Sequence, residues 1–83
     1  MADEGKSIRI GVVLQAGLRK YLNGEKERTV ELPADATIGD LVEALGMGED
    51  DVWIIGLNGR LAGRADRLED GDRVEFYEPV AGG

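Results

Sequence analysis

The chain has 83 residues, and its 17 Asp and Glu against 10 Lys and Arg give a formal net charge of −7. Its 42% of hydrophobic residues can form one small core, and the length excludes a second domain. Cys and His are absent, which excludes disulfides, thiolate metal sites, cysteine nucleophiles and a Ser-His-Asp triad.

The excess of acidic residues indicates which partners the chain would avoid. Binding to nucleic acid or to an anionic membrane requires Lys and Arg, so we expect neither, and a basic protein surface is the better match. No apolar run approaches the ~20 residues that span a bilayer, and the acidic start of the chain does not resemble a signal peptide. We therefore expect a cytoplasmic protein.

The first half of the chain predicts two strands and a short helical turn. Residues 1–6 are polar, and we expect a disordered lead there. A half-buried strand is predicted by four alternating apolar residues, Ile8, Ile10, Val12 and Leu14. The spacing of Leu18, Tyr21 and Leu22 favours a helical turn. A second strand is predicted from Arg28 to Pro33, with Val30 and Leu32 on one face.

One amphipathic helix is predicted in the middle of the chain. Thr37 is a suitable N-cap, and Asp40 follows it three residues later. An apolar stripe follows at helical spacing, formed by Ile38, Leu41, Val42 and Leu45. Gly46 would end the helix in the left-handed conformation. A helix this short must pack against a sheet to be stable.

The second half predicts a hairpin and a final strand. The segment 52–57 is apolar, and Asn58-Gly59 is a strong signal for a two-residue hairpin turn, with a brief return strand at Leu61-Ala62. The last strand spans 72–78, with Val74 and Phe76 inward and Glu75 and Tyr77 outward. Because both sides of 52–57 are apolar, two registers remain open. Either Ile54 and Gly56 or Trp53 and Ile55 face outward.

These elements predict an α+β fold, with one domain at residues 7–78 and a flexible tail at 79–83. The expected core consists of Ile8, Ile10, Val12, Leu14, Val30, Leu32, Ile38, Leu41, Val42, Leu45, Leu57, Val74 and Phe76.

Two motifs suggest ligand sites but lack residues that a phosphate-binding or a calcium-binding loop requires. The Gly46-Met47-Gly48 loop lacks the lysine of a phosphate loop and is followed by three carboxylates, so we interpret it as a solvated loop. The aspartates at 66, 70 and 72 miss two ligand positions of a calcium loop. We expect no bound metal and no bound cofactor.

The end of the sequence is unusual because Pro79-Val80-Ala81-Gly82-Gly83 follows directly after the last strand. Glycine suits a terminus that threads a narrow cleft, because it has no side chain. Together with three further segments, this tail resembles the MoaD/ThiS sulfur-carrier family over residues 7–83. The further segments are Glu31–Leu41, Leu57–Arg60 and Leu68–Val74. Within the family, the similarity is greatest to the small subunit of molybdopterin synthase.

The resemblance implies a ubiquitin-like β-grasp fold, with a mixed sheet of four to five strands, one main helix across it and a flexible Gly-Gly tail. It also implies a carrier rather than an enzyme. A partner related to ubiquitin-activating enzymes would use Mg-ATP to adenylate the carboxylate of Gly83. A sulfur donor such as a cysteine desulfurase or a rhodanese would convert it to a thiocarboxylate. The sulfur would then pass to a synthase subunit, for molybdopterin in the first place and for the thiazole of thiamin next.

The residues have distinct expected roles in this scheme. Gly83 reacts, Gly82 allows close approach to the partner, and Ala81, Val80 and Pro79 form the stalk. We expect Tyr77, Ile54 and Gly56 to form the docking surface. Two alternatives remain open. The chain could be a ubiquitin-like modifier joined through Gly83 to lysines, or a β-grasp interaction module whose tail is never activated.

Overall fold

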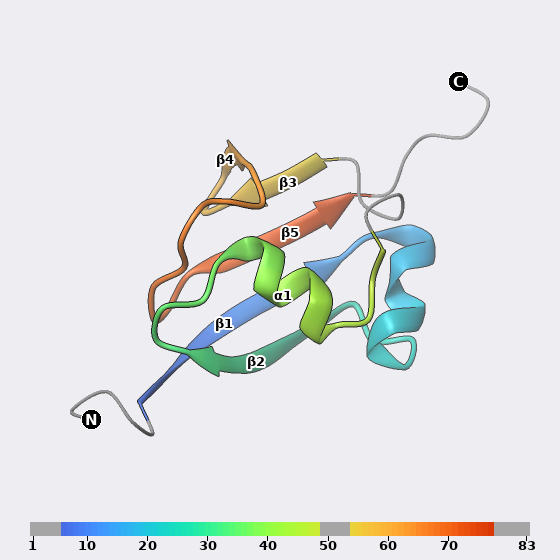
Figure 1. Cartoon of the computed structure of the whole chain (residues 1–83). Helices are drawn as coiled ribbons and strands as arrows, with labels where there is room; N and C mark the ends of the chain where they lie inside the picture. The colour runs from blue at the N-terminus through green and yellow to red at the C-terminus, as the bar shows by residue number, and fades with distance from the viewer. Residues whose placement is uncertain (1–5, 49–53, 78–83) are drawn as a thin grey trace.

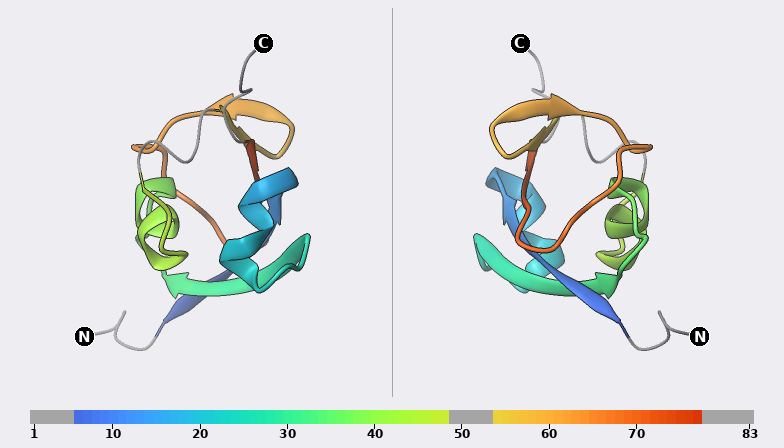
Figure 2. Two further views of the ribbon diagram at one scale, coloured as in Figure 1. Left: turned by 90° about the vertical axis from the view of Figure 1, so that its right-hand side faces the viewer. Right: turned by 90° about the vertical axis from the view of Figure 1, so that its left-hand side faces the viewer.

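Five strands form one mixed sheet that curves around a single α-helix (Figures 1 and 2). The computed structural model describes residues 6–48 and 54–77. In chain order the elements are β1 (Ser7–Leu14), the 3₁₀ helix η1 (Ala16–Leu22), β2 (Glu27–Pro33), α1 (Ile38–Ala44), β3 (Ile54–Leu57), β4 (Arg60–Ala62) and β5 (Arg73–Tyr77). The arrangement is the expected ubiquitin-like β-grasp.

The sheet has the order β2-β1-β5-β3-β4. β1 pairs antiparallel with β2 and parallel with β5, in a register that runs from Gly11 opposite Arg73 to Leu14 opposite Phe76. β5 pairs antiparallel with β3, and β3 continues into the β4 hairpin. The last described strand therefore lies in the centre of the sheet, where strands on both sides hold it.

The alternation of β1 is confirmed, because Ile8, Ile10, Val12 and Leu14 are all buried in the core cluster. Val13 alternates with these residues and therefore lies on the outer side of the sheet. It lies outside the core cluster, yet it is only 1% exposed. Its neighbours in the ladder are charged residues on β2 and β5, so a buried apolar residue also occurs on the outer side of the sheet.

Helix α1 begins with a full capping box. The Asp40 N–H donates to Thr37 Oγ1 at 3.2 Å, and the Thr37 N–H donates to Asp40 Oδ2 at 2.9 Å. This reciprocal pair satisfies two amide groups that a helix start leaves without partners. The helix ends at Ala44, one residue before the predicted stripe ends, and Gly46 has the expected positive φ of 81°.

The segments between the regular elements agree with the sequence prediction after β1 and differ from it after α1. The turn after β1 is a 3₁₀ helix of seven residues, and it buries Leu18 and Leu22 at the end of the sheet where β1 ends (Figure 1). The loop after α1 was predicted to be solvated. That prediction is wrong at Met47, which is 6% exposed and belongs to the core cluster. Gly46 ends the helix so that the chain returns Met47 to the core.

The β3–β4 hairpin has the turn that its sequence predicts. Asn58 and Gly59 have φ values of 52° and 87°, as a type I′ turn requires. Asn58 also joins the turn to β5, because its N–H donates to the Arg73 carbonyl at 2.8 Å and its Oδ1 accepts from the Arg73 N–H at 2.9 Å. The turn therefore fixes the register of the hairpin on the central strand.

The structure resolves the register of β3. Ile55 is buried at 7% exposure, whereas Ile54 is 44% exposed. The first of the two registers is therefore right, and Ile54 and Gly56 face outward.

The core differs in part from the predicted one. Leu57 was expected in the core but is only partly buried at its margin. Val30 and Leu45 are also only partly buried there, while the predicted core omitted Leu18, Leu22, Ala36, Met47, Ile55 and Leu68. Trp53 lies outside the described residues.

Candidate functional site

The expected reactive segment follows directly from the central strand. β5 ends at Tyr77, between β1 and β3 in the sheet. The predicted stalk and reactive end, Pro79, Val80, Ala81, Gly82 and Gly83, lie outside the described residues, so their roles stay predictions. The sheet fixes the position from which such a tail would begin.

Beside this point the outer side of the sheet carries an apolar surface, which we call the outer patch: Ile54, Gly56, Leu61 and Tyr77. Within the described part of the chain its three large side chains are the exposed large hydrophobic residues, at 44% for Ile54, 82% for Leu61 and 36% for Tyr77. Ile54 lies directly opposite Tyr77, and Gly56 directly opposite Leu61. Side chains in such opposed positions share a face of the sheet and contact one another.

Gly56 lies in the middle of the outer patch and leaves it flat. A Cβ at this position would meet the Arg60 carbonyl oxygen at 3.9 Å and Glu75 Cβ at 4.0 Å. Both distances are ordinary van der Waals contacts, so folding does not require glycine here. The missing side chain instead leaves room above the sheet between Leu61 on one strand and Glu75 on another.

The other half of the outer side is polar. Thr29 and Glu31 on β2 flank Arg9 and Gly11 on β1, and Arg73 Nη1 pairs with Glu27 Oε2 at 3.6 Å. The exposed apolar side chains thus gather on β3, β4 and the end of β5. An exposed apolar cluster with a polar rim is typical of a protein-docking surface.

The described residues include neither a buried polar centre nor a metal cluster. No polar or charged side chain among them is buried, and no cluster of three metal-ligating residues occurs in 6–48 or 54–77. No helix in these ranges is long and apolar enough to cross a membrane.

A model of the ThiS family matches residues 12–83, which is most of the chain and includes the whole tail. The chain belongs to the ThiS family. This agrees with the resemblance that the sequence motifs predicted.

Individual relatives of this ThiS-family chain carry different names. It is 37% identical over 79 residues to protein RnfH of Yersinia pestis, covering 88% of this chain and 79% of that protein. A putative molybdopterin converting factor, subunit 1, from Pyrococcus furiosus is 32% identical with a TM-score of 0.73, covering 88% of this chain and 99% of that one. SAMP1 from Haloferax volcanii is 27% identical with a TM-score of 0.71, covering 90% and 99%.

The structure brings together all three docking residues that the sequence predicted, since Ile54, Gly56 and Tyr77 share one face. The sequence analysis missed Leu61, which is the most exposed member of the outer patch. The sequence did contain a signal that places Leu61 on this face. A two-residue turn at Asn58-Gly59 pairs Leu57 with Arg60, and it must therefore place Leu61 opposite Gly56.

Proposed function

We propose that this chain is a sulfur carrier whose C-terminal carboxylate, at Gly83, is activated by a partner enzyme. The observation that carries the proposal is the central strand β5, which ends in the exposed outer patch at Tyr77, two residues before the Pro-Val-Ala-Gly-Gly sequence begins. The match of the ThiS family model through residue 83 supports it. A reactive end beside a docking surface lets one binding event position the carboxylate for reaction.

The chemistry divides into three steps. The Gly83 carboxylate oxygen attacks the α-phosphorus of Mg-ATP, and pyrophosphate leaves to give an acyl-adenylate. A persulfide sulfur from a cysteine desulfurase or a rhodanese then attacks the acyl carbon, and AMP leaves. Reduction of the resulting acyl disulfide by a thiol releases the thiocarboxylate. Because the chain has no Cys and no His, the activating groups come from the partners.

The outer patch would supply the contact with these partners. Ile54, Leu61 and Tyr77 provide apolar area, and aromatic residues are frequent anchors in interfaces. The net charge of −7 would guide association with a basic surface. We place these reactions in the cytoplasm, where ATP is available.

The acceptor of the sulfur is the finer part of the proposal. The name of the Pyrococcus furiosus relative, molybdopterin converting factor subunit 1, supports a second subunit as acceptor and favours molybdopterin synthesis. Thiazole synthesis is the next choice, because the family model is that of ThiS. The name of the RnfH relatives specifies neither pathway.

A second candidate function is that of a protein modifier, in which the activated Gly83 forms an isopeptide bond with a lysine. The likeness to SAMP1, whose name stands for small archaeal modifier protein 1, favours this alternative. The activation step is the same in both functions. High-mass conjugates in cells would identify the modifier, and a free thiocarboxylate would identify the carrier.

Intact-mass spectrometry tests the proposal. The full chain is incubated with the adenylating enzyme of the same genome, ATP and a sulfur source. We expect a mass increase equal to one exchange of oxygen for sulfur at Gly83. Deletion of Gly82 and Gly83 should abolish it, because the carboxylate would end about 7 Å short of its site.

The matched control is a deletion of Ala2 and Asp3, which removes as many residues from the other end and should leave the reaction intact. The melting temperatures of both variants should equal that of the full chain, because neither deletion touches the described fold. If the chain shortened at Gly82 still supports cofactor synthesis in cells, the carrier proposal is wrong and an interaction module with an inert tail is the better account.

A further inference from the structure

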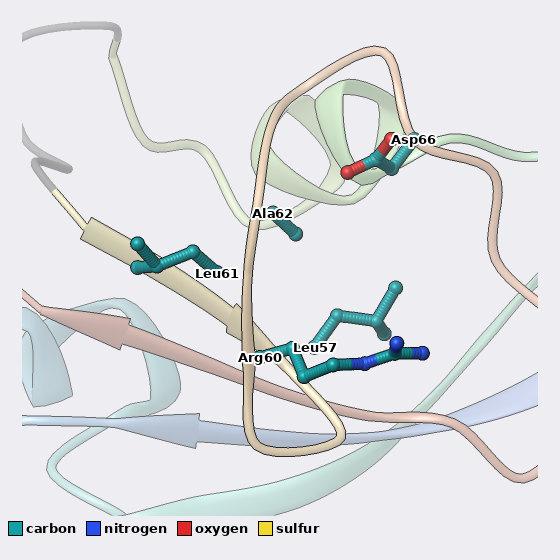
Figure 3. Close-up of a pocket in the computed structure, with 5 residues that line it drawn as sticks. All are labelled: Leu57, Arg60, Leu61, Ala62 and Asp66. Atoms are coloured by element: carbon teal, nitrogen blue, oxygen red, sulfur yellow. The ribbon is translucent and has the colours of Figure 1, made fainter.

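A hollow of about 290 Å³ lies at the β4 edge of the sheet, on the side that faces α1 (Figure 3). It is bordered by Leu57, Arg60, Leu61, Ala62 and Asp66. Leu57, Arg60 and Ala62 point into it from the hairpin, Asp66 lies across from Arg60, and the side chain of Leu61 points the opposite way. The hollow therefore opens on the other side of the sheet from the outer patch.

The loop that forms the far wall is fixed by helix α1. The first two amides of the helix donate to this loop, from Ile38 to the Asp66 carbonyl and from Gly39 to the Arg64 carbonyl, both at 2.9 Å. The Leu68 N–H donates to the Ala36 carbonyl at 2.9 Å. Gly39 permits the close approach, since a Cβ there would lie 3.3 Å from the Arg64 carbonyl oxygen. The walls are thus preformed, which lowers the entropic cost of filling the hollow.

The charge at this edge is opposite to that of the chain. Residues 60–67 hold three arginines and one aspartate, a net charge of +2, so the rest of the chain carries −9. Asp66 Oδ2 already accepts from the Gly63 N–H at 2.8 Å. Arg60 and Arg67 are exposed and form no ion pair within the described ranges. Two arginines outside this segment do form ion pairs, Arg28 with Glu25 at 2.7 Å and Arg73 with Glu27 at 3.6 Å.

We propose that the hollow binds an acidic peptide segment of a partner protein, with one apolar side chain packed on Leu57 and Ala62 and a carboxylate paired with Arg60. The volume is at the lower end of ligand pockets, which hold about 300–1,000 Å³, and so fits one side chain rather than a cofactor. The lining holds one arginine and one aspartate, and because Asp66 is already engaged by the Gly63 N–H, the exposed Arg60 and the nearby Arg67 favour an acidic segment over a basic one. This inference does not depend on the sulfur-carrier proposal, because the two surfaces lie on opposite sides of the sheet.

A titration of the ¹⁵N-labelled full chain tests the proposal, with the blocked peptide acetyl-Asp-Glu-Leu-Asp-Glu-amide as the probe. We expect chemical-shift changes at the residues whose side chains face the hollow, which are Leu57, Arg60, Ala62 and Asp66. Replacing the central leucine of the peptide by glycine should weaken binding about tenfold, as the loss of one buried apolar side chain does. A peptide with lysines in place of its acidic residues should not bind.

Matched variants distinguish binding in the hollow from a general effect of the protein's net charge. Arg60→Gln should weaken binding about fivefold, the upper end of what one exposed ion pair contributes. Arg9→Gln removes the same charge from an exposed arginine on β1, on the outer side of the sheet, and should leave the affinity unchanged. Ile54→Ala in the outer patch should also leave it unchanged. The dispersed spectrum of each variant reports its folding in the same experiment.

Three results would overturn the proposal. If Arg60→Gln and Arg9→Gln weakened peptide binding equally, the loss of affinity would come from the change in net charge and not from the hollow. Shift changes confined to Ile54, Gly56 and Tyr77 would place the peptide on the other side of the sheet. Stronger binding to phosphatidylcholine vesicles that contain phosphatidylserine than to the peptide would make a membrane surface the occupant.

Discussion

Adjacent residues on β3 and β5 occupy opposite environments. Ile55 is 7% exposed and Ile54 is 44% exposed, while Phe76 is fully buried and its neighbour Tyr77 is 36% exposed. Each pair has similar side chains and differs in the side of the pleat. The same two strands therefore stabilise the fold through one side and leave the other side available to partners. Stability and docking should therefore respond to different substitutions.

The largest difference in unfolding free energy should be between substitutions at Phe76 and Tyr77 on β5. Phe76→Ala should lower the free energy of unfolding by about 3–5 kcal/mol, because it leaves a cavity at the centre of the core. Tyr77→Ala should lower it by less than about 1 kcal/mol, because solvent already reaches the ring. Urea denaturation of both variants measures the difference. Similar losses for the two would show that the outer side also holds the fold together.

The isoleucine pair on β3 gives a sharper comparison, because the two residues are chemically identical. Ile55→Ala should cost about 2–4 kcal/mol of unfolding free energy, and Ile54→Ala less than about 1 kcal/mol. Thermal unfolding followed by circular dichroism gives both values. If Ile54→Ala proved the more costly, the register of β3 would be the one in which Trp53 and Ile55 face outward.

The hairpin turn controls which residues reach the outer patch. Gly59→Ala should destabilise the protein by about 1–2 kcal/mol, because an alanine at a φ of 87° is strained. The adjacent Arg60→Ala changes a residue next to the turn without this strain and serves as its control. Equal unfolding free energies for the two would mean that the turn tolerates a side chain and does not fix the register.

The smallest effect on stability should come from Leu61, which is 82% exposed. Leu61→Ser should change the free energy of unfolding by no more than about 0.5 kcal/mol, as surface substitutions usually do. It should nevertheless raise the dissociation rate from the adenylating enzyme, measured by surface plasmon resonance. An unchanged rate would remove Leu61 from the docking surface.

Much of the fold could be predicted because local patterns and tertiary contacts agree. The alternation in β1, the capping box at Thr37 and the Asn58-Gly59 turn each act over a few residues, and the structure has all three. Met47 and Val13 were not predictable in the same way. Met47 is buried because the chain turns back after Gly46, and Val13 because charged neighbours on two other strands surround it. Both depend on contacts far away in sequence.

The candidate site was predicted less completely than the fold. Tyr77, Ile54 and Gly56 were expected on one face and are found there, since β3 adopts one of the two registers that the apolar sequence allows. Leu61 follows from the hairpin geometry and was missed. The β4 hollow could not be found from sequence, because it depends on the hydrogen bonds that join the loop of Arg64 and Asp66 to the start of α1.

The parallel pairing of β1 with β5 affects how the molecule reaches its folded state. Gly11 and Arg73 are 62 positions apart in the chain, so their pairing must close a long loop before it gains any contact. The β1–β2 hairpin closes a much shorter one. Because β3 and β4 join the sheet only through β5, the three strands that carry the outer patch are tied to β1 and β2 by this one long-range pairing. A partner that binds only the fully folded chain would therefore also stabilise the pairing of β1 with β5.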